Sequence, residues 1–292
     1  MPNALEIRGL TKAFGEGFRL GPLDLTVPSG GIYGFVGPNG AGKTTTIDLI
    51  FGMGGKDAGS ISVFGLDHLR DEVEMKRQVG YISPELDFRP WGRINRAIDF
   101  VRGFYPSWDD SYCDRLLASL QLNRGDKIGT LSFGAKIKLS IVLALSWRPR
   151  LLVLDEPTVG LDAISRQQVF AELLAAVRDE HRAVLISSHA ITDVERIADH
   201  VGMIKNGQLV FEGSTGDVIE RYRIVDFVAT ADTGLDQQPG VVVQRREQDR
   251  WRVLIDRSVT SIERLTGRGA RAVSDAPVSL EELFVALGSN GQ

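Results

Sequence analysis

The sequence has very little cysteine, little net charge and no long apolar run. Cys113 is the only cysteine in 292 residues, which excludes an intrachain disulfide and fits a reducing compartment. A net charge of -4 gives no reason to expect a nucleic-acid partner. No apolar run reaches the roughly 18 residues that span a bilayer, and the first ten residues do not resemble a secretory signal. A role at a membrane would therefore need a second chain to supply the spanning part.

The chain length suits one large α/β domain with a small appendage. Short apolar runs at 31–37, 150–157 and 182–189 predict buried strands. Alternating runs at 5–10 and 20–27 predict antiparallel strands near a sheet edge. The sequence therefore predicts an α/β core that carries an antiparallel β part.

A helical insertion interrupts this pattern at residues 86–147, which contain no strand-like run. Amphipathic spacing predicts helices at 94–104, 108–120 and 134–145. Further along the chain, Asn206-Gly207 lies between two alternating runs and predicts a tight hairpin.

A seam near residues 221–225 divides the chain into residues 1–222 and a small α+β appendage, residues 223–292. The basic run Arg245–Arg252 contains acidic residues and lies between strand-like segments, which favours a solvated hairpin over a nucleic-acid surface. The terminal segment 277–287 predicts a helix that docks the appendage.

A glycine-rich loop follows the apolar run at 31–37 and fits the pattern G-x-x-x-x-G-K-[ST]. Glycines let backbone N–H groups turn inward toward phosphate oxygens, and the helix that follows adds its positive end. Lys43 is expected to reach the β- and γ-phosphates, and Thr44 to bind Mg²⁺. A glycine-rich turn with a chance lysine is the alternative. The predicted nucleotide-binding residues here are Gly37, Pro38, Asn39, Gly40, Ala41, Gly42, Lys43, Thr44 and Thr45.

Asp155 and Glu156 end a buried strand, at the edge of an α/β sheet where ligands bind. Asp155 is expected to hold Mg²⁺ through water, and Glu156 to polarise an attacking water molecule. A helix N-cap is the alternative interpretation. His189 follows a neighbouring buried strand and is expected to contact the γ-phosphate and order the water. The remaining histidines are interpreted as structural: His68, His181 and His200.

In this order, the motifs resemble those of the ATP-binding subunits of ABC transporters, over about residues 5–222. The segment Phe104–Asp109 is similar to a bacterial, exporter-like subgroup, the YtrB type. The resemblance implies the P-loop NTPase fold of ABC ATPases, with an antiparallel β subdomain and an inserted helical subdomain. It is carried by the Walker A motif Gly37–Thr44, the signature loop Leu131–Ala135, the Walker B motif Leu151–Glu156, the D-loop Pro157–Asp162, the switch histidine His189 and the adenine-stacking position, Phe14.

The resemblance implies a head-to-tail dimer in which each ATP lies between the Walker motifs of one subunit and the signature loop of the other. The family pattern L-S-G-G-Q reads L-S-F-G-A at Leu131–Ala135. The retained Ser132 and Gly134, together with Asp162, are expected to bind nucleotide across the interface. Phe133 replaces a glycine and alanine replaces the glutamine, which predicts a working but slowed site.

The family's metal-contacting glutamine, which follows a strand ending in "GY", has no counterpart here. Pro84 or Glu85 falls near its position. Because exporter-type subunits often carry glutamate there, Glu85 is the candidate Mg²⁺ contact.

Five aromatic residues crowd the helical insertion, and they predict either a groove for a helix of a membrane subunit or the core of the insertion. Most are expected to be core, with Trp91 the exposed one. The five are Phe88, Trp91, Phe104, Tyr105 and Trp108.

The resemblance implies an ATP-hydrolysing subunit that uses ATP and Mg²⁺ and works with a second ATP-binding subunit and a separate transmembrane permease. It places the chain on the inner face of the cell membrane, and favours a homodimer over a heterodimer and export over import. One alternative is a soluble ABC-type ATPase acting on ribosomes or DNA, against which the single Walker A motif counts. Another is a regulatory ATP-binding half of a heterodimeric transporter, which Glu156 and His189 oppose. No nucleic-acid partner is expected.

Overall fold

A mixed six-stranded sheet forms the centre of the molecule, in the order β10-β9-β3-β8-β7-β6. Neighbouring strands are parallel except β10, which runs antiparallel to β9. The strands are β3 (Gly31–Val36), β6 (Val79–Ile82), β7 (Leu151–Leu154), β8 (Ala183–Ser188), β9 (His200–Lys205) and β10 (Gln208–Ser214). The structure is a computed structural model that describes residues 3–15, 17–180, 182–229, 234–267 and 269–289.

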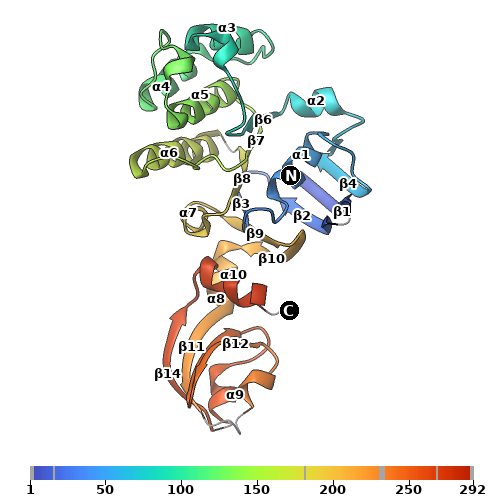
Figure 1. Cartoon of the computed structure of the whole chain (residues 1–292), viewed down its shortest axis with the longest axis vertical. Helices are drawn as coiled ribbons and strands as arrows, with labels where there is room; N and C mark the ends of the chain where they lie inside the picture. Colours follow the sequence, from blue (N-terminus) through green and yellow to red (C-terminus); the bar gives the residue numbers. More distant parts are fainter. Residues whose placement is uncertain (1–2, 16, 181, 230–233, 268, 290–292) are drawn as a thin grey trace.

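An antiparallel sheet lies beside this centre, in the order β2-β1-β4-β5 (Figure 1). Its strands are β1 (Leu5–Phe14), β2 (Phe18–Val27), β4 (Ala58–Val63) and β5 (Leu66–Asp67). Leu5 and Ile7 of β1 share one apolar core with Tyr33 and Phe35 of β3. Helices α1 (Lys43–Ile50) and α2 (Glu72–Lys76) contribute further side chains to the same core. The antiparallel strands predicted at 5–10 and 20–27 are confirmed.

The three helices predicted in the insertion are present as α3 (Ile94–Arg102), α4 (Asp110–Ser119) and α5 (Phe133–Leu145). Turns η1 (Arg89–Trp91) and η2 (Ile128–Thr130) precede α3 and α5. Asp109 begins α4 because its carboxylate accepts the backbone N–H of Tyr112 at 2.9 Å. Helix α5 is apolar over most of its surface and contacts α3, α4 and β6, so it forms the centre of the insertion.

The core ends with α6 (Ala163–Glu180), α7 (Ile191–Glu195) and the β9–β10 hairpin. Asn206 and Gly207 have φ values of 50° and 76°, the left-handed conformation that a two-residue hairpin turn of this type needs. The predicted hairpin is therefore confirmed. Among the residues that the structure describes, none of the helices combines the length and apolar character needed to cross a bilayer.

Helix α8 (Thr215–Arg221) leads directly into the appendage, which extends away from the core (Figure 1). Its antiparallel sheet has the order β12-β13-β11-β14. Trp251 is 1% exposed and packs with Val225 and Phe227 in a core of its own. The elements are β11 (Tyr222–Val228), η4 (Leu235–Gln237), β12 (Val241–Glu247), β13 (Arg250–Asp256), α9 (Ile262–Thr266), β14 (Arg271–Pro277) and α10 (Leu280–Ser289). The predicted hairpin at Arg245–Arg252 is formed by β12 and β13.

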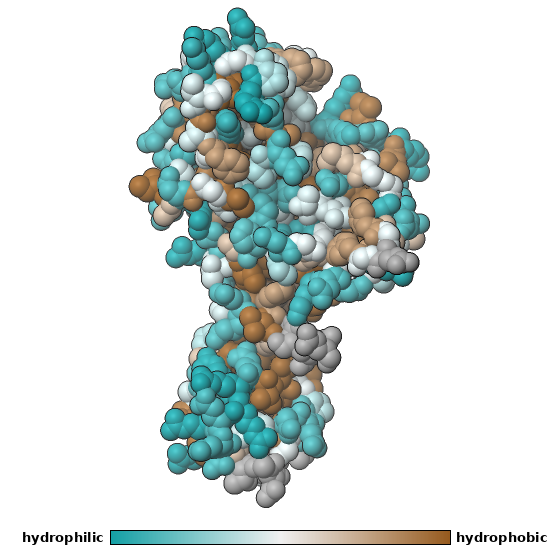
Figure 2. Space-filling model, in the orientation of Figure 1, coloured by the Kyte–Doolittle hydropathy of each residue, from teal (hydrophilic) through white to brown (hydrophobic). Residues whose placement is uncertain are grey.

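Helix α10 turns back and contacts α7, β10 and β12. The Leu280 N–H donates to Glu195 Oε1 at 3.0 Å, and Leu280 and Leu283 are fully buried. Hydrophobic residues gather around this narrow junction in Figure 2. The prediction that the terminal helix docks the appendage is therefore confirmed.

Candidate active site

The phosphate loop connects β3 to α1 and is braced by neighbouring backbone. The Gly37 N–H donates to the Ser188 carbonyl at 3.2 Å, and the Gly207 N–H donates to the Ala41 carbonyl at 2.9 Å. A Cβ on Gly37 would lie 2.2 Å from the Ile204 carbonyl oxygen, so only glycine fits there. Gly42 caps α1 with a left-handed φ of 112°. These contacts fix the loop next to the carboxyl ends of β3 and β8.

Lys43 points back into this loop and is 5% exposed. Its ammonium donates to the carbonyl oxygens of Gly37 at 2.7 Å and Pro38 at 3.2 Å. It also lies 3.1 Å from Glu156 Oε1. The loop cation and the carboxylate after β7, which are 113 positions apart in the sequence, therefore form one buried ion pair.

Thr44 and Asp155 form a second contact between the loop and the end of β7. The Thr44 hydroxyl donates to Asp155 Oδ2 at 2.8 Å. The Ser187 hydroxyl donates to the other carboxylate oxygen, Oδ1, at 2.5 Å. Ser187 was not predicted from the sequence, although it lies near the end of β8, the strand that pairs with β7.

Further carboxylates lie near Asp155. Partial burial raises the pKa of Asp48, and the charges of Asp155 and Glu85 raise it further. Glu85 is exposed in the loop after β6, the strand that pairs with β7. Oxygen donors with excess negative charge suit a hard divalent cation such as Mg²⁺, so the residues present fit that ion.

Glu156 pairs with Lys43 through Oε1 and contacts His189 through Oε2. His189 Nδ1 lies 2.8 Å from Glu156 Oε2, and the His189 backbone N–H donates to the same oxygen at 3.3 Å. The Glu156 N–H donates to the Ser187 hydroxyl at 3.0 Å. Glu156 has a φ of 48°, a left-handed conformation that costs a non-glycine residue about 1–3 kcal/mol. The fold holds this strained carboxylate between Lys43 and His189.

Phe14 lies at the tip of the β1–β2 hairpin and is 48% exposed. Its ring centroid is 6.2 Å from that of Phe18. A Cβ on Gly42 would lie 3.1 Å from the Phe18 ring, so the hairpin tip is next to the phosphate loop. An exposed aromatic face is thus available beside the loop.

The signature loop lies at the start of α5, away from α1 (Figure 1). Ser132 begins the helix, since its hydroxyl oxygen accepts the Ala135 N–H at 3.1 Å. Phe133 is 46% exposed, and its ring would lie 2.8 Å from a Cβ on Gly160. Asp162 begins α6: its carboxylate accepts the Ser165 N–H at 2.8 Å, a bond that lowers the pKa of Asp162. Together with Gly134 these residues line a depression of about 330 Å³.

The structure therefore brings Lys43, Thr44, Asp155, Glu156 and His189 together, and leaves the signature and D-loop residues in a separate group. Of the other histidines, His68 is buried and His200 is half-buried. His181 lies outside the described residues.

The expectation that Trp91 is the exposed aromatic residue of the insertion is wrong, because Trp91 packs partly buried against the main apolar core, as Phe88 and Trp108 do. None of the five is buried, and Phe104 is 66% exposed whereas Trp91 is half-buried. The physical reason is that Phe104 lies past the end of α3 and packs on Phe100, an exposed residue of that helix, whereas Ile94, Ala97 and Ile98 form its buried face. Ring contacts at 5.0 Å and 5.1 Å join Trp91 to Phe100 and Phe100 to Phe104.

A groove of about 280 Å³ lies between the insertion and the central sheet. Phe88 and Tyr105 of the insertion face Phe51 and Tyr81 across it. The Tyr105 ring also stacks on Trp147, with centroids 4.0 Å apart. The groove is therefore lined mainly by aromatic and aliphatic side chains.

Comparison with known proteins identifies relatives over nearly the whole chain. A family profile described as ABC transporter matches residues 20–159. The ABC transporter ATP-binding protein YtrB of Bacillus subtilis (strain 168) is 29% identical over 97% of this chain and 97% of its own. The Nod factor export ATP-binding protein I of Burkholderia lata is 35% identical over 75% of this chain and 74% of its own. A solved ATP-binding subunit of an ABC transporter superposes with a TM-score of 0.67 and 25% identity, covering 74% of this chain and 92% of its own.

Proposed function

Because the chain belongs to the ATP-binding proteins of ABC transporters, we propose that it drives export through a separate transmembrane chain by hydrolysing ATP at the phosphate loop. The chain is an ATPase of this family. The observation that supports this location of the chemistry is the buried contact of Lys43 with Glu156, which His189 completes. In the proposal, residues 1–222 form the ATP-binding domain, with its helical part at 86–147, and residues 223–292 form an accessory domain.

Glu156 acts as the group that polarises the attacking water. One of its oxygens is oriented by His189 and the other is paired with Lys43. A γ-phosphate placed in the loop competes for the Lys43 ammonium, which frees Glu156 Oε1 to accept a proton from water. His189 then orients both the carboxylate and the γ-phosphate. Nucleotide binding and activation of the base are thereby linked through one lysine.

Thr44 and Asp155 would hold Mg²⁺, Asp155 through water, and Glu85 would be a further contact. When bound, Mg²⁺ neutralises charge on the phosphate oxygens. Ser187 orients Asp155 by donating to the oxygen that does not contact Thr44. The loop residues Gly37–Thr45 surround the phosphates, and Phe14 stacks on the base.

A second ATP-binding subunit completes the site. Because Ser132 Oγ accepts a bond from Ala135, its hydroxyl hydrogen is available to donate to a phosphate across the interface. Gly134 and Asp162 line the same depression and approach the partner's nucleotide with it. A homodimer satisfies this arrangement with two equivalent sites.

The transmembrane partner docks in the aromatic groove of the helical insertion. An amphipathic helix that inserts apolar side chains between Phe88 and Tyr105 suits such a surface. This contact would hold the chain at the inner face of the cell membrane. The direction of transport is proposed from the name of the Burkholderia relative, an export protein.

The test is steady-state ATP hydrolysis by the purified chain beside Glu156→Gln, with size-exclusion chromatography in Mg-ATP. We expect the variant to lose about 10²–10⁴-fold in turnover and to accumulate as an ATP-bound dimer. Glu72→Gln, which removes an exposed carboxylate of α2, is the control and should behave as the parent. Parental turnover in Glu156→Gln would sink the role given to this carboxylate.

A regulatory half of a heterodimeric transporter is the second candidate, because Phe133 of the signature loop places an aromatic ring over Gly160 of the D-loop. It predicts a chain that binds ATP without hydrolysing it or dimerising alone. Under that result, hydrolysis would appear only after mixing with a second ATP-binding subunit.

A further inference from the structure

The appendage sheet has one covered face and one that is only half covered. Phe227, Trp251 and Val253 point to the covered face and form the core with η4 and α9. On the other face, Ile224 and Leu254 pack in the cluster that contains α10. Beyond them, toward the free end of the sheet, the strand register continues for two more rows of side chains.

Antiparallel residues that lie directly opposite each other project from the same face of a sheet. One row of the half-covered face therefore contains Glu247, Arg250, Val228 and Arg271. The next row contains Arg245, Arg252, Asp226 and Ser274. These eight residues, which come from all of β11 to β14, carry four arginines and two carboxylates.

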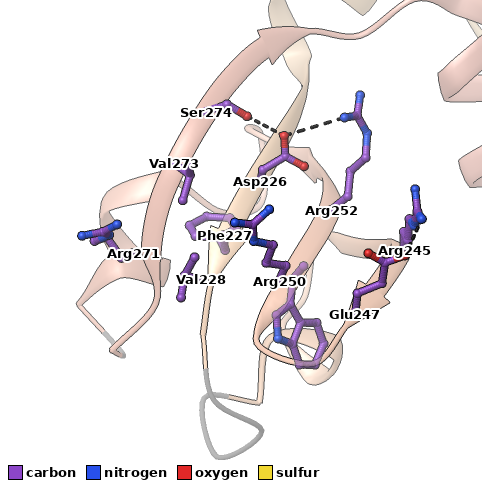
Figure 3. Close-up of a pocket in the computed structure, with 11 residues that line it drawn as sticks. Asp226, Phe227, Val228, Arg245, Glu247, Arg250, Arg252, Arg271, Val273 and Ser274 are labelled. Atoms are coloured by element: carbon purple, nitrogen blue, oxygen red, sulfur yellow. Dashed lines mark hydrogen bonds and ion pairs between the residues drawn. The ribbon is translucent and has the colours of Figure 1, made fainter.

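The two rows line a pocket of about 410 Å³ (Figure 3). This volume falls within the range of small-molecule sites, roughly 300–1,000 Å³. Its surface is not purely polar, since Val228 is 36% exposed and Val273 is 61% exposed. Hydrophilic residues cover most of the free end of the appendage in Figure 2. The pocket thus combines an apolar part, Val228 and Val273, with a set of arginine side chains.

Two of the four arginines have partners that balance their charge. Arg252 lies 3.2 Å from Glu282 of α10 and 3.7 Å from Asp226. Arg245 pairs with Glu247. These contacts account for the carboxylates of the pocket.

Arg250 and Arg271 are different. Within the described part of the chain, neither guanidinium has a hydrogen bond or an ion pair. Both are opposite Val228, one on each side. Two strand spacings put their backbones about 10 Å apart, which lets both side chains reach an anion held over the valine.

We propose that this pocket binds a small organic anion, with a carboxylate or phosphate between Arg250 and Arg271 and an apolar part on Val228 and Val273. Guanidinium groups match these anions with paired N–H donors. An extended polyanion or a membrane surface fits less well, because it would also cover Asp226 and Glu247 in the same two rows. The site is remote from the phosphate loop and independent of the function proposed above.

The test is calorimetric titration of the full chain with hexyl phosphate and with hexanoate, in saturating Mg-ADP so that the phosphate loop is occupied. We expect at least one of the two probes to bind with one site per chain, and the preferred probe identifies the anionic group. Hexanol, which has the same apolar part without the charge, should not bind. Arg250→Gln combined with Arg271→Gln should weaken binding roughly tenfold or more.

Arg257→Gln combined with Arg264→Gln is the matched control, because it removes two appendage arginines outside the pocket. It should bind as the parent does, and melting curves should show that both variants fold. Equal weakening in both double variants, or no binding of either probe at millimolar concentration, would overturn the proposal. So would binding of heparin or anionic vesicles alone, lost in the pocket variant, which would identify a macromolecular surface instead.

Discussion

The phosphate loop region and the appendage pocket use charge in opposite ways. Around the loop, Lys43 and Asp155 are each 5% exposed and each has several partners. In the pocket, the arginines are exposed and two of them have no partner in the described residues. Buried charges are tolerated only with complete pairing, whereas exposed guanidinium groups keep their hydration until a ligand replaces it. The first region is assembled for chemistry, and the second is available for recognition.

The largest expected effect is on the unfolding free energy of the appendage, from a substitution that leaves the ATP site intact. Trp251→Ala removes the central side chain of the appendage core and should cost about 3–5 kcal/mol of unfolding free energy in that part. Because the ATP site lies on other apolar clusters, ATP hydrolysis should persist. Calorimetry and ATPase assays on the same sample would measure both.

Arg246→Gln is the control for that variant, since its guanidinium stacks on the outside of Trp251 at 4.1 Å. It should leave the appendage folded. Loss of ATP hydrolysis in Trp251→Ala at a temperature where the core remains folded would show that the two regions act as one unit.

Ser187→Ala tests whether the buried carboxylate of the active site depends on its hydroxyl partner. The change leaves Asp155 Oδ1 and the Glu156 N–H without their shared partner, at a cost of about 1.5–3 kcal/mol for a bond to a charged group. We expect turnover to fall and the Mg²⁺ concentration for half-maximal activity to rise by about 10–100-fold. Ser188→Ala is the neighbouring control, and parental Mg²⁺ dependence in Ser187→Ala would contradict the orienting role.

The active site could be predicted from the sequence to a greater extent than the appendage pocket. Contiguous motifs located the buried strands, the phosphate loop and the acidic strand end, because each depends on spacing along one segment. Ser187 was missed because its role depends on which strand lies beside β7, and sheet order is a property of the tertiary structure. For the appendage, the sequence predicted only a solvated hairpin at Arg245–Arg252. The two rows of side chains that line the pocket form only when four strands pair in register. The strand β14 was not predicted because its residues are almost all exposed, and its apolar and polar side chains do not alternate.

Phe133→Gly tests whether the altered signature loop slows the enzyme. The substitution removes the ring over Gly160 and restores the family's glycine. We expect turnover to rise by about two- to fivefold, which corresponds to less than about 1 kcal/mol. Phe104→Ala is the control, because it removes an exposed aromatic ring that does not line the groove. A fall in turnover would show that the aromatic ring supports the dimer interface.

The smallest effect should be the pH dependence of the joint between the two regions. Arg221 Nη2 lies 2.6 Å from Asp256 Oδ2. Partial burial raises the pKa of Asp256, but hydrogen bonds from Arg221 and Ser258 outweigh it, so the pKa is lowered. A carboxyl group whose pKa is lower in the folded state stabilises the fold above its unfolded pKa of about 3.9 and loses that contribution as pH falls through the folded value. The appendage should therefore melt at lower temperature as the pH drops below about 4. Asp256→Asn should flatten this dependence by an amount below about 1 kcal/mol, because the pair is partly exposed. A melting profile with the same slope in both proteins would assign the acid sensitivity to other carboxylates.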